Sequence, residues 1–174
     1  MKIAVQVQIE PSEPTNQRIN YRWDEDTDIL TAELLPRIEG KGMSGSVGLE
    51  GNDGSWVILD IAAGRIAAIE IPVWPEVRKF STLAPPTSIE EARVTIPARQ
   101  SQPNIASVEM NSDLYAESDA KQTIIHFRLG RPHRARTIRI ARELLLEVNE
   151  KSQISGLWLL NVPPGPPPSI DDEL

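Results

Sequence analysis

The amino-acid sequence predicts a mostly β protein with little helix, in which two tandem antiparallel β-meander repeats pack as one pseudo-symmetric body. Two apolar runs at residues 58–61 and 66–71 flank a short turn that contains Gly64, which is the local signature of a β-hairpin. A similar pair of runs follows at residues 145–148 and 154–159, separated by a polar connection. This recurrence indicates that the chain contains one β unit twice.

Two further correspondences support the duplication. An acidic residue is third in the first run of each pair, at Asp60 and Glu147, and a proline follows each second run, at Pro72 and Pro163. Because one unit alone would bury too little apolar surface, we expect the two to share a core.

The chain then divides into four parts. Residues 1–77 form the first β repeat with its N-terminal strand, and residues 78–104 form a Pro-rich connection with a strand near 93–96. Residues 105–162 form the second, diverged repeat. Residues 163–174 form a Pro-rich, acidic tail that we expect to be disordered, because it can bury little apolar surface.

Alternation of apolar and polar residues predicts the other strands of the first repeat. Residues 2–9 alternate, so the start of the chain is a strand and not the continuous apolar core of a signal peptide. The same period resumes at residues 18–23, and these two strands could pair as a hairpin with a long loop. Residues 29–34 form a further strand that Pro36 ends, and residues 46–50 form a shorter one.

The second repeat and the connection before it contain two places where helix competes with strand. Residues 88–91 fit a capping box, which predicts a single helical turn. Residues 141–150 are rich in strong helix formers. The repeat alignment nevertheless places this segment opposite residues 57–61, which have the pattern of a strand. We therefore predict that residues 141–150 are strand.

Composition limits the class of protein. The chain has 174 residues, 40% hydrophobic and 25% charged, as expected of a globular protein with a core. The absence of cysteine excludes disulfides, thiolate zinc sites and cysteine nucleophiles, and it favours a cytoplasmic location. No apolar run approaches the roughly 20 residues that span a bilayer, so we expect no membrane partner. The net charge of −7 disfavours nucleic acid, because phosphate contacts need a basic surface.

Residues 23–30 (Trp-Asp-Glu-Asp-Thr-Asp-Ile-Leu) and residues 64–71 (Gly-Arg-Ile-Ala-Ala-Ile-Glu-Ile) together resemble a widespread family of small bacterial domains of unknown function. The resemblance covers about residues 19–72. The second repeat is a diverged version that keeps acids at Glu117 and Asp119 but has a tryptophan in place of the glutamate of the closing strand. The resemblance implies a compact β-meander that pairs with another copy, and it implies no reaction.

The acidic turn at residues 24–28 invites a calcium hypothesis, because carboxylates are preferred calcium ligands. An EF-hand loop that began at Asp24 would need Gly at its sixth position and Glu at its twelfth, where the chain has Ile29 and Leu35. That loop is excluded, which leaves a looser divalent-metal site or a turn whose acids accept backbone hydrogen bonds. If this turn met the acidic segment 117–119, the two could form the site of a small-ligand or divalent-metal binding protein or of a hydrolase.

Other chemical motifs are weak. Residues 40–45 match the G-x-G-x-x-G pattern, but no helix is expected after them and no βαβ unit surrounds them, so we expect no nucleotide cofactor. His126 and His133 are too few for a histidine metal site, and neither accompanies a nucleophile elbow. We predict no catalytic residue and no metal ligand. The four tryptophans are expected in the core or between the repeats, with ligand stacking as the alternative.

Six arginines between residues 128 and 142 form the basic run of the chain. One interpretation is a binding patch for an anionic partner, chiefly a protein, formed by Arg131, Arg134, Arg136 and Arg139. The alternative is that these arginines line the outer face of a strand and pair with carboxylates. We expect a non-catalytic structural or protein-interaction module that binds a protein partner or forms a homodimer through its exposed sheet edges.

Overall fold

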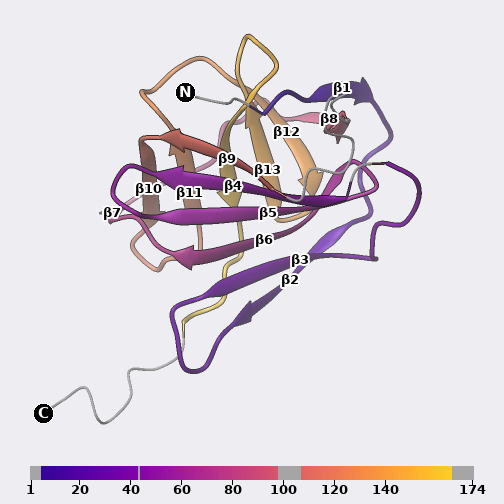
Figure 1. Cartoon of the computed structure of the whole chain (residues 1–174). Coiled ribbons are helices and arrows are strands. Elements are labelled where there is room, and N and C mark those ends of the chain that lie inside the picture. Colours follow the sequence, from indigo (N-terminus) through magenta and orange to yellow (C-terminus); the bar gives the residue numbers. More distant parts are fainter. Residues whose placement is uncertain (1–4, 43, 98–106, 166–174) are drawn as a thin grey trace, which may run out of the picture.

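The chain folds into β-strands and their connections over the residues that the computed structural model describes, which are 5–42, 44–97 and 107–165. Two sheets lie face to face, one layer in front of the other in Figure 1. The prediction of a mostly β fold with little helix is confirmed. Within the same ranges, no helix is long and apolar enough to cross a membrane.

The first sheet has six strands in the order β2-β3-β6-β5-β4-β9. Their bounds are Arg18–Trp23 (β2), Leu30–Leu35 (β3), Arg65–Val73 (β6), Trp56–Ala62 (β5), Gly45–Gly51 (β4) and Ser107–Ser112 (β9). Neighbouring strands are antiparallel except for β4 and β9, which are parallel.

The second sheet has eight strands in the order β1-β8-β12-β13-β14-β11-β10-β7. Their bounds are Gln8–Pro11 (β1), Glu90–Thr95 (β8), Arg136–Ala141 (β12), Leu144–Val148 (β13), Ile154–Leu159 (β14), Ile125–Leu129 (β11), Leu114–Asp119 (β10) and Val77–Phe80 (β7). The β8–β12 and β7–β10 pairs are parallel, and the other pairs are antiparallel.

Each sheet contains five antiparallel strands that are connected in the same way. The order β2-β3-β6-β5-β4 in the first sheet corresponds to β10-β11-β14-β13-β12 in the second. In both cases a hairpin is followed by a three-stranded meander whose last strand returns to pair with the hairpin. The equal order agrees with two related units, while the duplication itself and a pseudo-symmetry axis stay predictions.

The sheets exchange strands between the two halves of the chain. β1 and β7, from the first half, lie at the two edges of the eight-stranded sheet, whereas β9, from the second half, lies at an edge of the six-stranded sheet. The expected hairpin between residues 2–9 and 18–23 is wrong, because β1 pairs with β8 and β2 pairs with β3. Residues 2–4 of that hairpin lie outside the described residues.

The predicted connection over residues 78–104 contributes strand residues to the fold. It contains most of β7 and all of β8, which overlaps the strand predicted near 93–96; residues 98–104 lie outside the described ranges. The helical turn expected at residues 88–91 is wrong. Glu90 and Glu91 already belong to β8, because pairing with β12 supplies more hydrogen bonds than one isolated turn of helix could.

Two local predictions are confirmed. The hairpin around Gly64 joins β5 to β6, and its turn residues Ala63 and Gly64 have φ angles of 53° and 73°, as in a type I′ turn. The helix formers of residues 141–150 lie in the end of β12, a turn at residues 142–143 and β13, so the predicted strand is confirmed at Ala141 and Leu144–Val148 only. Packing between neighbouring strands overrides their helix propensity here.

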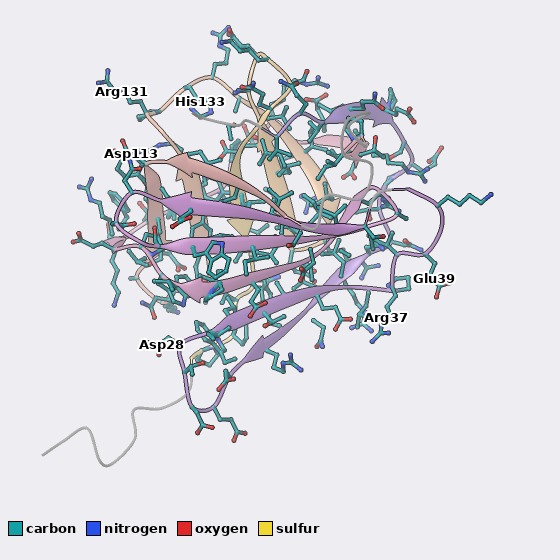
Figure 2. The ribbon with its side chains drawn as sticks, viewed as in Figure 1. Asp28, Arg37, Glu39, Asp113, Arg131 and His133 are labelled. Carbon is teal, nitrogen blue, oxygen red and sulfur yellow. The ribbon has the colours of Figure 1, made fainter. Side chains whose placement is uncertain are left out.

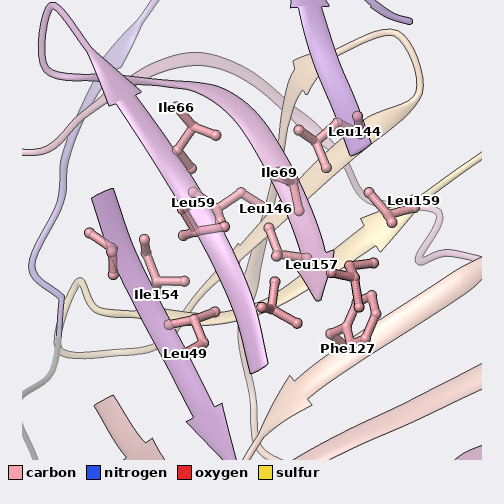
Figure 3. Packing of buried hydrophobic residues seen from close by; sticks show 14 of the residues in the cluster. Leu49, Leu59, Ile66, Ile69, Phe127, Leu144, Leu146, Ile154, Leu157 and Leu159 are labelled. Atoms are coloured by element: carbon pink, nitrogen blue, oxygen red, sulfur yellow. The ribbon is translucent and has the colours of Figure 1, made fainter. Parts of the chain in front are cut away.

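Alternation gives each sheet one apolar face, and these two faces meet to form the core. Figure 3 shows Leu49, Leu59 and Ile69 of the six-stranded sheet close to Leu146 and Leu157 of the eight-stranded sheet. Burying each such side chain contributes roughly 1.5–3 kcal/mol. The shared core therefore holds the two sheets together and fixes which face of each sheet points outward.

Candidate functional site

A continuous row of side chains crosses the outer face of the eight-stranded sheet. Its members lie directly opposite one another on neighbouring strands, and so they share one face of the sheet. In strand order the row contains Arg78 (β7), Glu117 (β10), His126 (β11), Trp158 (β14), Leu145 (β13), Arg139 (β12) and Glu91 (β8). We call it the outer row. An outer sheet face is normally solvated and polar, so its buried centre is unusual.

His126 is the polar centre of the outer row and is only 8% exposed. Its Nε2 makes a short hydrogen bond with Glu147, and its Nδ1 lies 3.8 Å from Glu117 Oε2. The Nη1 of Arg128 lies 3.4 Å from the other oxygen of Glu117. On its face, the imidazole stacks on Trp158 with ring centroids 4.0 Å apart. His126 thus lies between two carboxylates, one of which also faces Arg128, within a partly buried network.

Gly156 makes this network possible. It lies opposite both Glu147 and Arg128 on the neighbouring strands, at the position where a side chain would cover the sheet. A Cβ at this position would collide with the carboxylate of Glu147 and would lie 2.7 Å from the Phe127 carbonyl oxygen. The missing side chain therefore lets Glu147 reach across β14 to His126 on β11.

The exposed part of the same face lies towards the β7 edge and consists of two aromatic–arginine pairs. Tyr115 lies opposite Arg128, whose guanidinium is 4.8 Å from the ring centroid. Arg78 lies 5.7 Å from the Phe80 ring centroid. Tyr115 is 41% exposed and Phe80 is 37% exposed. We call these four residues the aromatic–arginine face.

The structure divides the four arginines that were predicted to bind a partner. Arg136 makes two hydrogen bonds to Glu90, of 2.9 and 2.7 Å, and Arg139 lies 3.4 Å from Glu91. These two arginines pair with carboxylates of β8, as the alternative interpretation expected. The hydrogen bonds from Arg136 lower the pKa of Glu90.

Arg131 and Arg134 lie instead in the exposed loop between β11 and β12. Figure 2 shows the Arg131 side chain at the outer rim of this loop, near His133 and on the same side as Asp113. Neither arginine has an ion pair in the described part of the chain. The loop begins where β11 ends beside β10, so these charges extend from the aromatic–arginine face.

The two acidic turns meet at one cavity, but their carboxylates do not form a metal site. The cavity has a volume of about 310 Å³ and is lined by Trp23, Asp28, Trp74 and Ser118, among others. Glu117 points to the outer row, while Asp119 accepts hydrogen bonds from Thr123 and Ile124 of its own turn. The described residues contain no group of three or more His, Cys, Asp or Glu that could hold a metal ion.

The first acidic turn is organised by its own backbone. Asp24 Oδ1 accepts a 2.8 Å hydrogen bond from the Asp26 amide, and the Asp24 amide donates to the Ile29 carbonyl. Nearby, Trp23 and Trp74 stack with ring centroids 5.8 Å apart. Their indole N–H groups donate to backbone carbonyls of Pro163 and Asp28 respectively. Two of the four tryptophans thus line a cavity at the end of the core.

The remaining motif has a structural explanation. The motif ends at Gly45, which is the first residue of β4, so a strand follows it where a nucleotide-binding loop would need a helix. Gly40, Gly42 and Gly45 have positive φ angles, and a Cβ at Gly42 would lie 2.7 Å from the Ala63 carbonyl carbon. Glycine is therefore required here by backbone conformation and close packing.

The sequence analysis assigned His126 neither to a metal site nor to a nucleophile elbow, and it did not connect this residue with Glu117, Glu147 or Trp158. The signal available in the sequence was alternation. Glu117, His126 and Glu147 each occupy an outward-facing position of a strand, next to residues that are buried. The sequence analysis also missed the aromatic–arginine face. Tyr115 lies beside Arg128 because of the register between β10 and β11, and local sequence pattern does not reveal that register.

Comparison with models of known protein families gave no match, and comparison with curated proteins gave none either. The resemblance of residues 19–72 to a family of small bacterial domains therefore stays a prediction.

Proposed function

We propose that the protein is a non-catalytic protein-interaction module that binds an acidic protein segment through the aromatic–arginine face and the adjoining loop arginines. One observation supports this most directly: Tyr115 and Phe80 are exposed, and each is paired with an arginine on the same sheet edge. Tyrosine, phenylalanine and arginine are enriched at protein interfaces, and tyrosine and arginine are over-represented among their energetic hot spots.

The network beneath this face supports binding rather than catalysis. His126, Glu117, Glu147 and Arg128 are engaged with one another, and His126 is covered by the Trp158 ring. Groups held in this way fix the strand positions and the orientation of Arg128. Such pre-organisation lowers the ordering cost of binding.

Charge selects the partner. Arg78, Arg131 and Arg134 bring guanidinium groups without an ion pair in the described residues to this end of the molecule, whereas Arg128 pairs with Glu117. The chain as a whole has a net charge of −7. A partner with carboxylates around an apolar side chain would complement both the guanidinium groups and the aromatic rings. The turn at residues 24–28 of a second copy has such carboxylates, so self-association belongs to the same proposal. We propose the cytoplasm as the location.

The test is a selection from a displayed library of random peptides on the full chain, followed by affinity measurement by fluorescence anisotropy. We expect acidic peptides that lose at least about tenfold in affinity, or 1.4 kcal/mol, against the F80S/Y115S variant. The matched control is W56S, because Trp56 is 39% exposed on the outer face of the other sheet. Sedimentation over a concentration range tests the self-association arm with the same variants.

Two results would contradict the proposal. One is a set of selected peptides that bind the wild type and F80S/Y115S equally well. The other is a loss of affinity in W56S as large as in F80S/Y115S, because the binding surface would then not be the aromatic–arginine face.

A second candidate function is a small-ligand binding protein, and the cavity between Trp23, Trp74 and Ser118 favours it. The cavity joins the two acidic turns that the sequence suggested as a ligand site, and stacked indole rings suit a flat apolar ligand. Quenching of tryptophan fluorescence by 8-anilinonaphthalene-1-sulfonate tests it. We expect saturable quenching that is abolished in Trp74→Leu and retained in Trp56→Leu; equal quenching in both variants would exclude this cavity.

A further inference from the structure

The cavity between Trp23 and Trp74 lies where the C-terminal segment leaves the core. Val162, shortly after β14, is buried, and its amide donates a 2.9 Å hydrogen bond to the Thr123 carbonyl. The chain then passes directly to the cavity, because Pro163 and Gly165 both line it. Two of the first three residues of the Pro-rich tail therefore form part of the cavity wall.

Trp23 contacts this segment in two ways. Its indole N–H group donates a 3.0 Å hydrogen bond to the Pro163 carbonyl. Its ring also faces Gly165, where an added Cβ would lie 3.9 Å from the ring, at ordinary van der Waals distance. One tryptophan thus holds a proline-rich backbone through both its ring and its N–H group. Aromatic-lined grooves are the usual receptors of proline-rich segments.

Trp74 enlarges this aromatic surface. Its ring stacks on Trp23 with centroids 5.8 Å apart and planes inclined by 19°, and it also packs against Phe127. Its N–H group donates to the Asp28 carbonyl, so the ring is held in position. Both tryptophans are only partly buried. The aromatic wall therefore exists before any ligand binds, which lowers the ordering cost of binding.

The rest of the lining suits an uncharged ligand that is rich in hydrogen-bond acceptors. Val77 and Ile125 provide apolar surface, and the exposed Gln122 has an amide that can donate to carbonyl oxygens. Asp28 also lines the cavity, but it is exposed, so water can solvate its carboxylate. Among the described residues no arginine or lysine lines the cavity, so an anion would find no counter-charge there.

The sequence places a matching ligand next to this cavity. Residues 166–168, Pro-Pro-Pro, follow Gly165 directly and lie beyond the described residues; we call them the proline run. Because Pro166 is bonded to Gly165, their Cα atoms are about 3.8 Å apart, so the proline run begins at the cavity wall. Proline has no N–H group, and its fixed φ favours the polyproline II conformation. Tethering also gives the proline run a roughly millimolar effective concentration at the cavity.

We infer that the cavity between Trp23 and Trp74 is a docking site for the proline run of the same chain, which continues the contacts that Pro163 and Gly165 begin. The pyrrolidine rings pack on the indole rings and cover the cavity. This inference rests on the cavity of the second candidate function and adds its regulation, because the proline run and a small ligand would compete for the same space. It does not depend on the aromatic–arginine face.

The test is fluorine NMR of the full chain labelled with 5-fluorotryptophan, which gives one resonance for each of the four tryptophans. Single Trp→Phe variants assign the resonances. The variant P166S/P167S/P168S, which we call the serine variant, should move the resonances of Trp23 and Trp74 and leave those of Trp56 and Trp158 in place. The matched control is D171N/D172N/E173Q, which changes the same tail but keeps the proline run, and it should move none of the four.

Hexaproline gives a second readout. Added to the serine variant, it should return the Trp23 and Trp74 resonances towards their wild-type positions. The wild type should bind it at least about tenfold more weakly, which is the effect of an occupant that fills the cavity in about nine-tenths of the molecules.

The inference is overturned if the Trp23 and Trp74 resonances are unchanged in the serine variant, or if the control variant moves them equally. It is also overturned if hexaproline binds the wild type as tightly as the serine variant. Wild-type resonances that shift to the serine-variant positions on dilution would assign the site to the proline run of a second copy and refute docking within one chain. The second candidate function is decided separately, by quenching with 8-anilinonaphthalene-1-sulfonate in the serine variant.

Discussion

Gly156 lies directly opposite Glu147 in the β13–β14 pair, and the Glu147 carboxylate occupies the space that any side chain at position 156 would need. This pairing links a missing side chain on one strand to a buried histidine two strands away from Glu147. It makes the outer face of the eight-stranded sheet sensitive to small changes in side-chain volume at position 156.

We predict that Gly156→Ala destabilises the protein by about 2–4 kcal/mol, measured by urea unfolding. The new Cβ would displace Glu147 and press on the Phe127 carbonyl, which belongs to the backbone and cannot move aside cheaply. Gly48→Ala is the matched control. Its Cβ would approach only Trp56 Nε1, on a partly exposed side chain that can rotate, so its cost should stay below about 1 kcal/mol. Equal losses of unfolding free energy in the two variants would show that the cost comes from replacing any strand glycine and not from the contact with Glu147 and Phe127.

His126 and Glu147 should be energetically coupled. His126→Leu leaves two carboxylates beside an apolar side chain, and Glu147→Leu removes the hydrogen-bond partner of the imidazole, so each should cost about 2–4 kcal/mol. We expect the double variant to cost less than the sum by at least about 1 kcal/mol. A double-mutant cycle in urea measures this difference, and strict additivity would mean that the pair contributes no interaction energy.

Asp119 should stabilise the β10–β11 turn only when it is ionised. Hydrogen bonds from the Thr123 hydroxyl and from the Thr123 and Ile124 amides lower its pKa below the usual 3.8. A lowered pKa contributes stability that is present above pH 3.8 and is lost as the pH falls through the value in the folded state. Asp119→Asn should therefore lower the urea midpoint at pH 7 and lose this effect in strong acid. Asp26→Asn serves as the control, and a pH-independent difference for Asp119→Asn would contradict the prediction.

Asp60 should act in the opposite sense. Burial raises its pKa above 3.8, so the folded state binds a proton more readily than the unfolded chain, and stability is lost as the pH rises through the raised value. Asp60→Asn should therefore raise the midpoint at pH 7 and have little effect below pH 3.8. Thermal unfolding at several pH values measures it, and a lower midpoint at neutral pH would refute the assigned cause.

The strands themselves were largely predictable from alternation and turn chemistry. The hairpin at Gly64 and the strand at Leu144–Val148 were both assigned correctly, the second against its helix propensity. The partner of the N-terminal strand was not predictable, because pairing between β1 and β8 joins residues that are more than 80 positions apart. Local pattern specifies a strand but not the strand with which it pairs. The capping box at residues 88–91 was misleading, because the chain continues there as strand β8.

The candidate sites depended on information that alternation does not carry. Arg128 belonged to the basic run that the sequence highlighted, but its contact with Tyr115 comes from the β10–β11 register. The cavity of Trp23, Trp74 and Ser118 collects residues from three distant segments, so no spacing in the sequence marks it. Arg136 and Arg139 show the converse: charge alone suggested a free patch, and the position of β8 supplied their carboxylates.

The exchange of edge strands has a consequence for how the chain must be made. Because the ribosome synthesises the protein from its N-terminus, β4 has no parallel neighbour until residues 107–112 emerge. In the same way, β1 has no partner strand until residues 90–95 emerge. The N-terminal half therefore spends its synthesis with open hydrogen-bonding edges, and its completion depends on the arrival of the other half. Cutting the gene between the halves would yield two incomplete products, which would regain the native form only by meeting each other.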